Sequence, residues 1–232
     1  MTADRPIFDP DRHIYRLRGE IIPGVTTILS RAIAKPSLAF WRGKVGNPEA
    51  SRVSRLATEH GTAVHAVCER IAKHEPEPWD LTELEPAIYK PAIAFRGWLN
   101  ETVGRVIGTE LLVWSEKLWY AGTADLVVQM RGDEHATVID LKTSKSGYPP
   151  DPSWRGQLSA YQVALWESAG IRATRRVVLQ LPSNSPGALI LHEFPRDDAR
   201  GDWEAFRAAL ALYGWLERVE AGQDAPRSGV IR

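Results

Sequence analysis

An apolar run ends in two charged residues at VIDLKT, residues 138–143. Side chains alternate across a β-strand, so Asp140 and Lys142 share one face if this run is a strand. The preceding β-rich run contains GTAD, residues 122–125, and a hairpin between the two runs would place Asp125 beside Asp140. Neighbouring carboxylates repel unless a cation lies between them. Because Mg²⁺ and Mn²⁺ prefer oxygen ligands, the pattern predicts a site for metal-assisted phosphodiester hydrolysis, in which Lys142 orients a water or stabilises charge on the phosphate.

The segments around this stretch predict an α/β fold. Three β-rich runs separated by short turns indicate antiparallel neighbours. A helix at 153–169 followed by an apolar strand at 176–181 indicates a crossover and therefore a parallel pair. The remaining expected elements are an N-terminal hairpin turning at Arg18-Gly19, helices near 25, 49–73 and 83–103, an edge strand at 189–194 and an amphipathic C-terminal helix. We therefore expect a mixed central sheet flanked by helices, with an N-terminal helical lobe.

Length and composition restrict the possibilities further. With 232 residues the chain is expected to form a single domain, comprising a hairpin and helical lobe (1–104), a sheet core (105–195) and a C-terminal helix and tail (196–232). Its formal net charge is zero, but residues 31–73 are rich in Lys and Arg. We see neither a membrane-spanning apolar run nor a secretory signal, so we expect a cytoplasmic protein without a membrane partner. Cys68 is the one cysteine, which excludes an internal disulfide and a cluster held by four thiolates of this chain.

An isolated Asp-x-Lys is also compatible with surface carboxylates and a solvated lysine, so the choice between a catalytic site and a surface strand end depends on the surrounding motifs. In order along the chain stand GTAVH (61–65), Glu110, GTAD (122–125), VIDLKT (138–143) and QLSAY (157–161). This series resembles the RecB-like branch of the PD-(D/E)XK nuclease superfamily, which has a restriction-endonuclease-like fold. The N-terminal IPGVTTIL (22–29), followed by Trp41, is similar to a subgroup of phage-type and mitochondrial genome-maintenance exonucleases. Some members of the branch carry an iron–sulfur cluster on four cysteines, and this chain should lack it.

The resemblance implies roles for individual residues. The catalytic residues would be Asp125, Asp140, Lys142, Gln157 and Tyr161, and the metal ligands would be His65, Asp125, Asp140 and the backbone carbonyl of Leu141. Spacing alone favours a core histidine at His65, on the apolar face of helix 49–73 that Ala57, Gly61, Val64, Cys68 and Ile71 define; the resemblance favours a metal ligand instead. Glu110 is a candidate for a metal ligand or for a carboxylate that supports the ligands, and the alternative is a carboxylate that merely begins a strand. Glu116 competes with it because the strand register is open.

Two more groups of residues are candidates for the site. Gln157 and Tyr161 are one helical turn apart and share a face; the resemblance places that face near the active site, and the alternative is a buried amide with a packed phenol. Contacts with DNA are expected from Trp41, which can stack on an unpaired base, and from Arg42, Lys145 and Arg155, with Ser144 a weaker candidate. Loop residues of this kind are also commonly just solvated.

These inferences favour a DNA exonuclease that requires Mg²⁺ or Mn²⁺ and acts on single-stranded or frayed ends in phage or bacterial recombination and repair. The alternatives are an endonuclease of the same fold and a DNA-binding module that has lost catalysis. A recombinase or single-strand-binding partner, the polarity of digestion, processivity and the oligomeric state are left open by the sequence.

Overall fold

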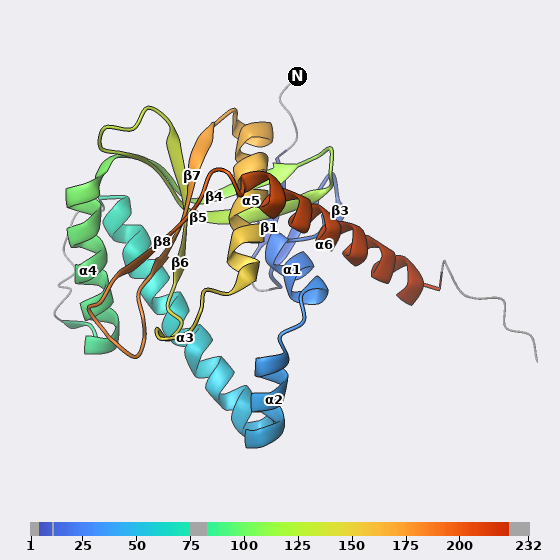
Figure 1. The fold of residues 1–232 in the computed structure, drawn as a ribbon, viewed down its shortest axis with the longest axis horizontal. Coiled ribbons are helices and arrows are strands. Elements are labelled where there is room, and N and C mark those ends of the chain that lie inside the picture. The colour runs from blue at the N-terminus through green and yellow to red at the C-terminus, as the bar shows by residue number, and fades with distance from the viewer. Residues whose placement is uncertain (1–4, 11, 75–82, 223–232) are drawn as a thin grey trace, which may run out of the picture.

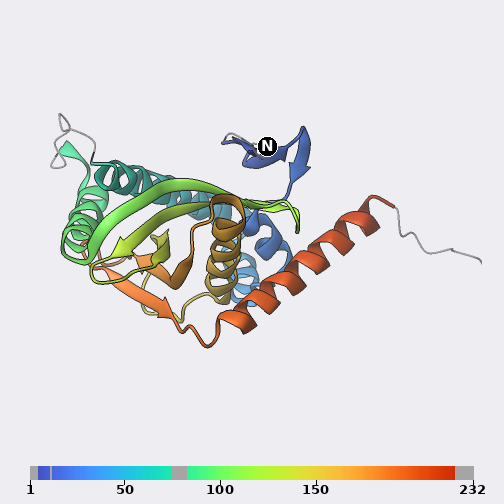
Figure 2. The same ribbon diagram turned by 90° about the horizontal axis from the view of Figure 1, so that it is seen from above.

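The computed structural model describes residues 5–10, 12–74 and 83–222. In these residues a five-stranded sheet of order β4-β5-β6-β7-β8 lies between two layers of helices (Figures 1 and 2). Its strands are β4 (Val103–Ser115), β5 (Tyr120–Met130), β6 (Ala136–Lys142), β7 (Ala173–Gln180) and β8 (Ile190–Phe194). The pair β6 and β7 is parallel and the other neighbours are antiparallel. The expected mixed sheet is therefore present, because helix α5 (Pro152–Ala169) provides the crossover between β6 and β7.

Alternating side chains of the sheet form a separate hydrophobic core on each face. Helix α5, together with α1 (Val25–Ala32) and α6 (Ala199–Glu220), packs on one face. Helices α3 (Asn47–Ala72) and α4 (Pro86–Thr102) pack on the other. Along β6, Val138 belongs to the first core, whereas Ile139 and Leu141 belong to the second. Asp140 and Lys142 therefore lie on the face covered by α5.

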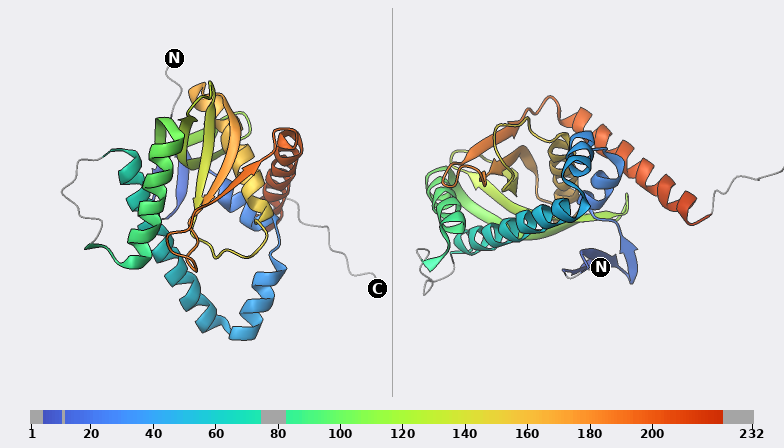
Figure 3. Two further views of the ribbon diagram at one scale, coloured as in Figure 1. Left: turned by 60° about the vertical axis from the view of Figure 1, so that its left-hand side comes forward. Right: turned by 90° about the horizontal axis from the view of Figure 1, so that it is seen from below.

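The helices of the N-terminal part do not form one lobe. Helix α4 and the second half of α3 cover the sheet, whereas α2 (Pro36–Val45) and the first half of α3 project away from it (Figures 1 and 3). Val64, Cys68 and Ile71 are buried as expected, but Ala57 is exposed because it lies on the projecting half. Helix α2, which sequence reasoning did not anticipate, buries none of its residues.

A small antiparallel sheet precedes the helices. It consists of β1 (Ile7–Asp9), β2 (Ile14–Leu17) and β3 (Glu20–Ile22). The predicted turn at Arg18-Gly19 is confirmed, with φ angles of 53° and 83°. Strand β1 was not expected from the sequence. Tyr15, Leu17 and Ile22 pack against Ala121 of β5, so this sheet is fixed to the β4–β5 hairpin.

The element boundaries differ slightly from expectation. Helix α4 ends at Thr102 and β4 begins at once at Val103, whereas a boundary between 104 and 105 was expected. The tail beyond residue 222 lies outside the described residues. Within the described part of the chain, no helix combines the length and the apolar character needed to cross a membrane.

Candidate active site

The site lies where strands β5 and β6 separate. Their ladder ends at the pair Leu126–Ile139, and the same register continued by one residue sets Asp125 opposite Asp140. Beyond that point the Asp125 carboxylate accepts the backbone N–H of Leu141, with Oδ2 2.6 Å from the nitrogen. The Asp125 side chain thus accepts from a backbone N–H of β6 that no longer has a partner on β5. This contact fixes the Asp125 carboxylate beside β6.

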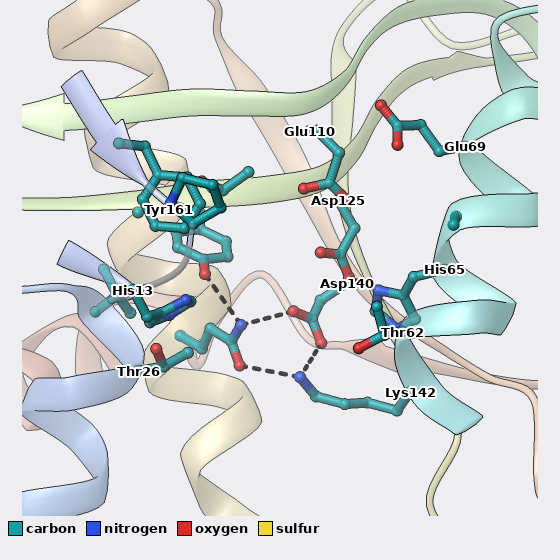
Figure 4. Close-up of a pocket in the computed structure, with 18 of the residues that line it drawn as sticks. His13, Thr26, Thr62, His65, Glu69, Glu110, Asp125, Asp140, Lys142 and Tyr161 are labelled. Carbon is teal, nitrogen blue, oxygen red and sulfur yellow. Dashed lines mark hydrogen bonds and ion pairs between the residues drawn. The ribbon is translucent and has the colours of Figure 1, made fainter. Parts of the chain in front are cut away.

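Asp140 and Lys142 share a network with helix α5 (Figure 4). Lys142 Nζ lies 2.6 Å from Asp140 Oδ2 and donates to Gln157 Oε1 at 3.3 Å. Gln157 Nε2 donates to Asp140 Oδ1 at 2.6 Å and to the Tyr161 hydroxyl at 3.1 Å. Gln157 therefore sets the orientation of both charged side chains, and Tyr161 in turn supports Gln157.

Two glycines allow the neighbouring elements to approach this network. A Cβ atom at Gly122 would lie 2.5 Å from Cε1 of Tyr161. A Cβ atom at Gly61 would lie 3.1 Å from Oγ1 of Thr143, directly after β6. Gly122 is thus needed for the close packing of the Tyr161 ring on β5, and Gly61 makes a tight approach of α3 to the end of β6 possible.

Helix α3 brings His65 to the opposite side of the site. Its Nδ1 lies 3.7 Å from Asp125 Oδ2, and the imidazole is partly exposed to the cleft. His65 points toward Asp125 and Asp140 in Figure 4. The geometry is therefore that of a histidine facing a carboxylate cluster, rather than that of a histidine enclosed in the core.

Glu110 completes a group of possible ligands. Ligand atoms of His65, Glu110 and Asp125 all lie within 4.8 Å of one another. Glu110 has a φ angle of 44°, a left-handed conformation that is uncommon for a residue other than glycine. Strained backbone of this kind often occurs where a side chain must be aimed at a functional site. Its competitor Glu116 lies elsewhere, in an ion pair with Arg18.

The cleft that these residues line has a volume of about 540 Å³, which is within the range of small-ligand sites. Burial, followed by the Asp140 carboxylate, raises the pKa of Asp125 to about 6. Burial, followed by Asp125 and Glu69, raises the pKa of Glu110 to about 7. Burial opposes the charge on Lys142, but Asp140 and Asp125 outweigh it and raise the pKa of that ammonium group. The cleft therefore concentrates acidic groups that are costly to ionise together.

The donor set fits a divalent cation. One imidazole and two carboxylates are close enough to share an ion, and oxygen-rich sets of this kind suit Mg²⁺ or Mn²⁺. Asp140 lies outside this group of three; Gln157 donates to its Oδ1, and Lys142 Nζ lies 2.6 Å from its Oδ2. Asp140 Oδ2 is buried without a well-directed hydrogen bond, so it retains capacity for a further electrophilic partner. The predicted role of the Leu141 carbonyl remains a prediction.

The residues predicted to contact DNA are scattered. Trp41 and Arg42 lie on the projecting helix α2, and Lys145 is exposed in the loop after β6. Arg155 does not face the cleft: it forms ion pairs of 2.6 and 2.7 Å with Asp198 and Asp202. Because Asp202 also pairs with the buried Arg176, this cluster joins α5, α6 and β7. Arg155 therefore links elements of the fold, and its contact with DNA remains a prediction.

Sequence reasoning missed several residues of the cleft. Glu69 follows His65 by one helical turn and lines the same cleft, so its i,i+4 spacing was an available signal. Phe8, His13, Tyr15 and Thr26 line it from the N-terminal segment. No local pattern connects these four residues with Asp125, which lies about a hundred residues further along the chain.

The chain belongs to the PD-(D/E)XK nuclease superfamily, whose family model matches residues 36–229. Its mixed five-stranded sheet flanked by helices is the fold of that superfamily. Among solved structures, the chain is similar to SSO0001, with 19% identity, a TM-score of 0.31 and coverage of 72% of this chain and 77% of that one. It is also similar to the alkaline exonuclease LHK-Exo from Laribacter hongkongensis, with 18% identity and a TM-score of 0.34. The match covers 70% of this chain and 84% of that one. No curated protein sequence matches the chain significantly.

Proposed function

We propose that this protein is a divalent-metal-dependent DNA exonuclease of the RecB-like branch, acting on single-stranded or frayed ends. The observation that carries the proposal is the convergence of His65, Glu110 and Asp125 beside the Asp140–Lys142 pair in one cleft. Membership of a nuclease superfamily supports phosphodiester hydrolysis as the reaction.

The proposed mechanism assigns the ion to His65, Glu110 and Asp125, with Asp140 as a neighbouring oxygen donor. Bound there, Mg²⁺ or Mn²⁺ would supply Lewis-acid stabilisation and a lower pKa for an attacking water. Lys142 is held 2.6 Å from Asp140, and its raised pKa keeps it positively charged at neutral pH. A fixed positive charge at this point stabilises the negative charge that grows on the phosphate in the transition state.

Gln157 and Tyr161 act in this mechanism as positioning residues. The Gln157 amide holds Asp140 with its nitrogen and Lys142 with its oxygen. Burial, followed by the Asp140 and Asp125 carboxylates, keeps the pKa of Tyr161 well above its ordinary value. The phenol therefore stays protonated and serves as a hydrogen-bond partner rather than as a base.

The exonuclease mode rests on the resemblance of residues 22–29 and Trp41 to exonucleases of the branch. The projecting helix α2 carries exposed Arg42 and Lys44, and their charge suits a DNA strand entering the cleft. The proposed setting is recombination or repair in the cytoplasm of a bacterium or phage-infected cell, where a recombinase or single-strand-binding protein would be a natural partner.

End-labelled linear DNA, single- and double-stranded, should be compared with a closed circle in Mg²⁺, Mn²⁺ or EDTA. Wild-type protein is expected to degrade the linear molecules only with metal, and Asp140→Asn is expected to abolish this loss. Cleavage of the circle would replace the exonuclease with an endonuclease. Binding of DNA without cleavage under either metal would refute the enzyme and favour a binding module.

A further inference from the structure

The cleft has a second wall that the proposed hydrolytic chemistry does not use. Opposite the side that carries His65 and Lys142, it is lined by Phe8, His13 and Tyr15 of the N-terminal sheet and the segment between its strands. In Figure 4 the imidazole of His13 lies on the far side of Asp140 from His65 and points into the cleft. The N-terminal sheet thus faces the same space as the acidic cluster.

The three rings form an ordered aromatic cluster. Phe8 and Tyr15 stack with centroids 4.6 Å apart and an interplanar angle of 27°. His13 meets Phe8 edge-on at 5.3 Å and 86°. Tyr15 is 3% exposed, whereas Phe8 is half-buried and His13 is exposed. Tyr15 is therefore the support of the cluster, and Phe8 and His13 are the rings that an incoming molecule meets.

This wall is attached to the catalytic strands. The Tyr15 hydroxyl is 3.0 Å from Oγ1 of Thr123, two residues before Asp125. The backbone N–H of Ala121 donates to the Pro23 carbonyl at 3.0 Å. His13 adopts a φ angle of 53°, an uncommon conformation that directs its side chain from a short turn. The position of the rings relative to the acidic cluster is consequently fixed by β5.

The chemistry of the two walls is complementary to the two ends of a nucleotide. Lys142 is the one Lys or Arg among the described residues that line the cleft, and it belongs to the acidic side, where a phosphate would meet the metal. The aromatic side offers flat apolar faces and an imidazole edge with a donor and an acceptor. Nucleobases bind to such surfaces by stacking and by edge hydrogen bonds, but only after they have left a duplex.

We infer that Phe8 and His13 form a nucleobase subsite, which receives the unpaired base beside the scissile phosphate and thereby selects single-stranded ends. This inference rests on the proposed nuclease function and names the feature of the substrate that the cleft selects. The cleft volume of about 540 Å³ is of the size that a single nucleotide requires.

The first test measures base stacking without cleavage. Single-stranded oligonucleotides carrying 2-aminopurine as the first nucleotide at the 5′ or the 3′ end are titrated with protein in EDTA. Wild-type protein is expected to quench the fluorescence of at least one of them. Phe8→Leu, which keeps apolar packing on Tyr15, and His13→Ala should each reduce this quenching, and Phe8→Tyr should restore it. Trp166→Leu serves as the matched control, because Trp166 is a 60% exposed ring outside the cleft.

The second test measures selection during hydrolysis. With Mg²⁺ or Mn²⁺, wild-type protein should cleave a normal terminal nucleotide at least about fivefold faster than an abasic one. Phe8→Leu and His13→Ala should bring this ratio toward one, chiefly through KM, while melting temperatures confirm that each variant is folded. Quenching with no hydrolysis would refute the proposed function but retain the subsite. Hydrolysis with no quenching and a ratio of one in wild type would overturn the subsite alone.

Discussion

Replacing Asp125 with asparagine is expected to stabilise the metal-free protein while it destroys the proposed site. The Asp125 side chain is 15% exposed, and its pKa is raised from 3.8 to about 6 by burial and then by Asp140. Between these two values the folded protein retains a proton that the unfolded chain has released. The contribution of Asp125 to the free energy of unfolding is therefore highest below about pH 4, and it is lost as the pH rises through 6.

The magnitude follows from the shift. Two pKa units correspond to about 3 kcal/mol at pH 8, and structural relaxation around the cleft should reduce the measured gain to about 2 kcal/mol. An asparagine oxygen can still accept the Leu141 N–H, so the substitution preserves the contact that fixes this side chain. For a domain of this size, such a gain corresponds to a rise in melting temperature of roughly 4–8 °C.

Thermal unfolding of wild type and Asp125→Asn should be compared in EDTA at pH 5 and pH 8. The variant should melt higher at pH 8, and the difference should shrink at pH 5, where wild-type Asp125 is largely protonated. Mg²⁺ or Mn²⁺ should raise the melting temperature of wild type but not of the variant. Asp197→Asn, at an exposed position outside the cleft, should show neither effect. Equal melting temperatures at pH 8 in EDTA would refute the electrostatic reasoning.

Three further substitutions separate ligands, packing and architecture. Glu110→Gln should raise the metal concentration needed for half-maximal cleavage by about tenfold or more, whereas Glu116→Gln should leave it unchanged; equal responses would remove Glu110 from the site. Gly122→Ala places a Cβ 2.5 Å from the Tyr161 ring and should cost about 1–3 kcal/mol of unfolding free energy, and an unchanged denaturation midpoint would contradict this packing. Arg155→Met should cost about 1–3 kcal/mol of unfolding free energy, because Asp198 loses this ion pair and Asp202 keeps only its pair with the buried Arg176. DNA affinity should be retained, and a selective loss of affinity would support the predicted contact of Arg155 with DNA.

Elements with a strong local pattern were predictable from the sequence. Strand β6 and helix α5 combine apolar alternation or helical periodicity with clear turn residues, and the structure places both within a residue or two of expectation. Helix α2 was missed because it buries no residue and therefore carries no apolar periodicity. Strand β1 has three residues, which is too short for any pattern to emerge.

The candidate site was predictable where one segment supplies it and unpredictable where distant segments meet. The Asp140–Lys142 pair follows from alternation along one strand. The choice between Glu110 and Glu116 could not be made from alternation, because register shifts at 103–105 and 106–108 interrupt the alternation of side chains along β4. The ion pairs of Arg155 could not be predicted because its aspartate partners lie 43 and 47 residues further along the chain. The wall formed by Phe8 and His13 depends on docking of the N-terminal sheet onto β5, which no local pattern encodes.

The most direct test of the central claim is the cleavage rate of labelled single-stranded DNA by Asp125→Asn at pH 8 with Mg²⁺, relative to wild type. The account predicts a fall of at least about a hundredfold in a protein that is more stable than wild type without metal. A rate within a few-fold of wild type would contradict the assignment of hydrolysis to this cleft.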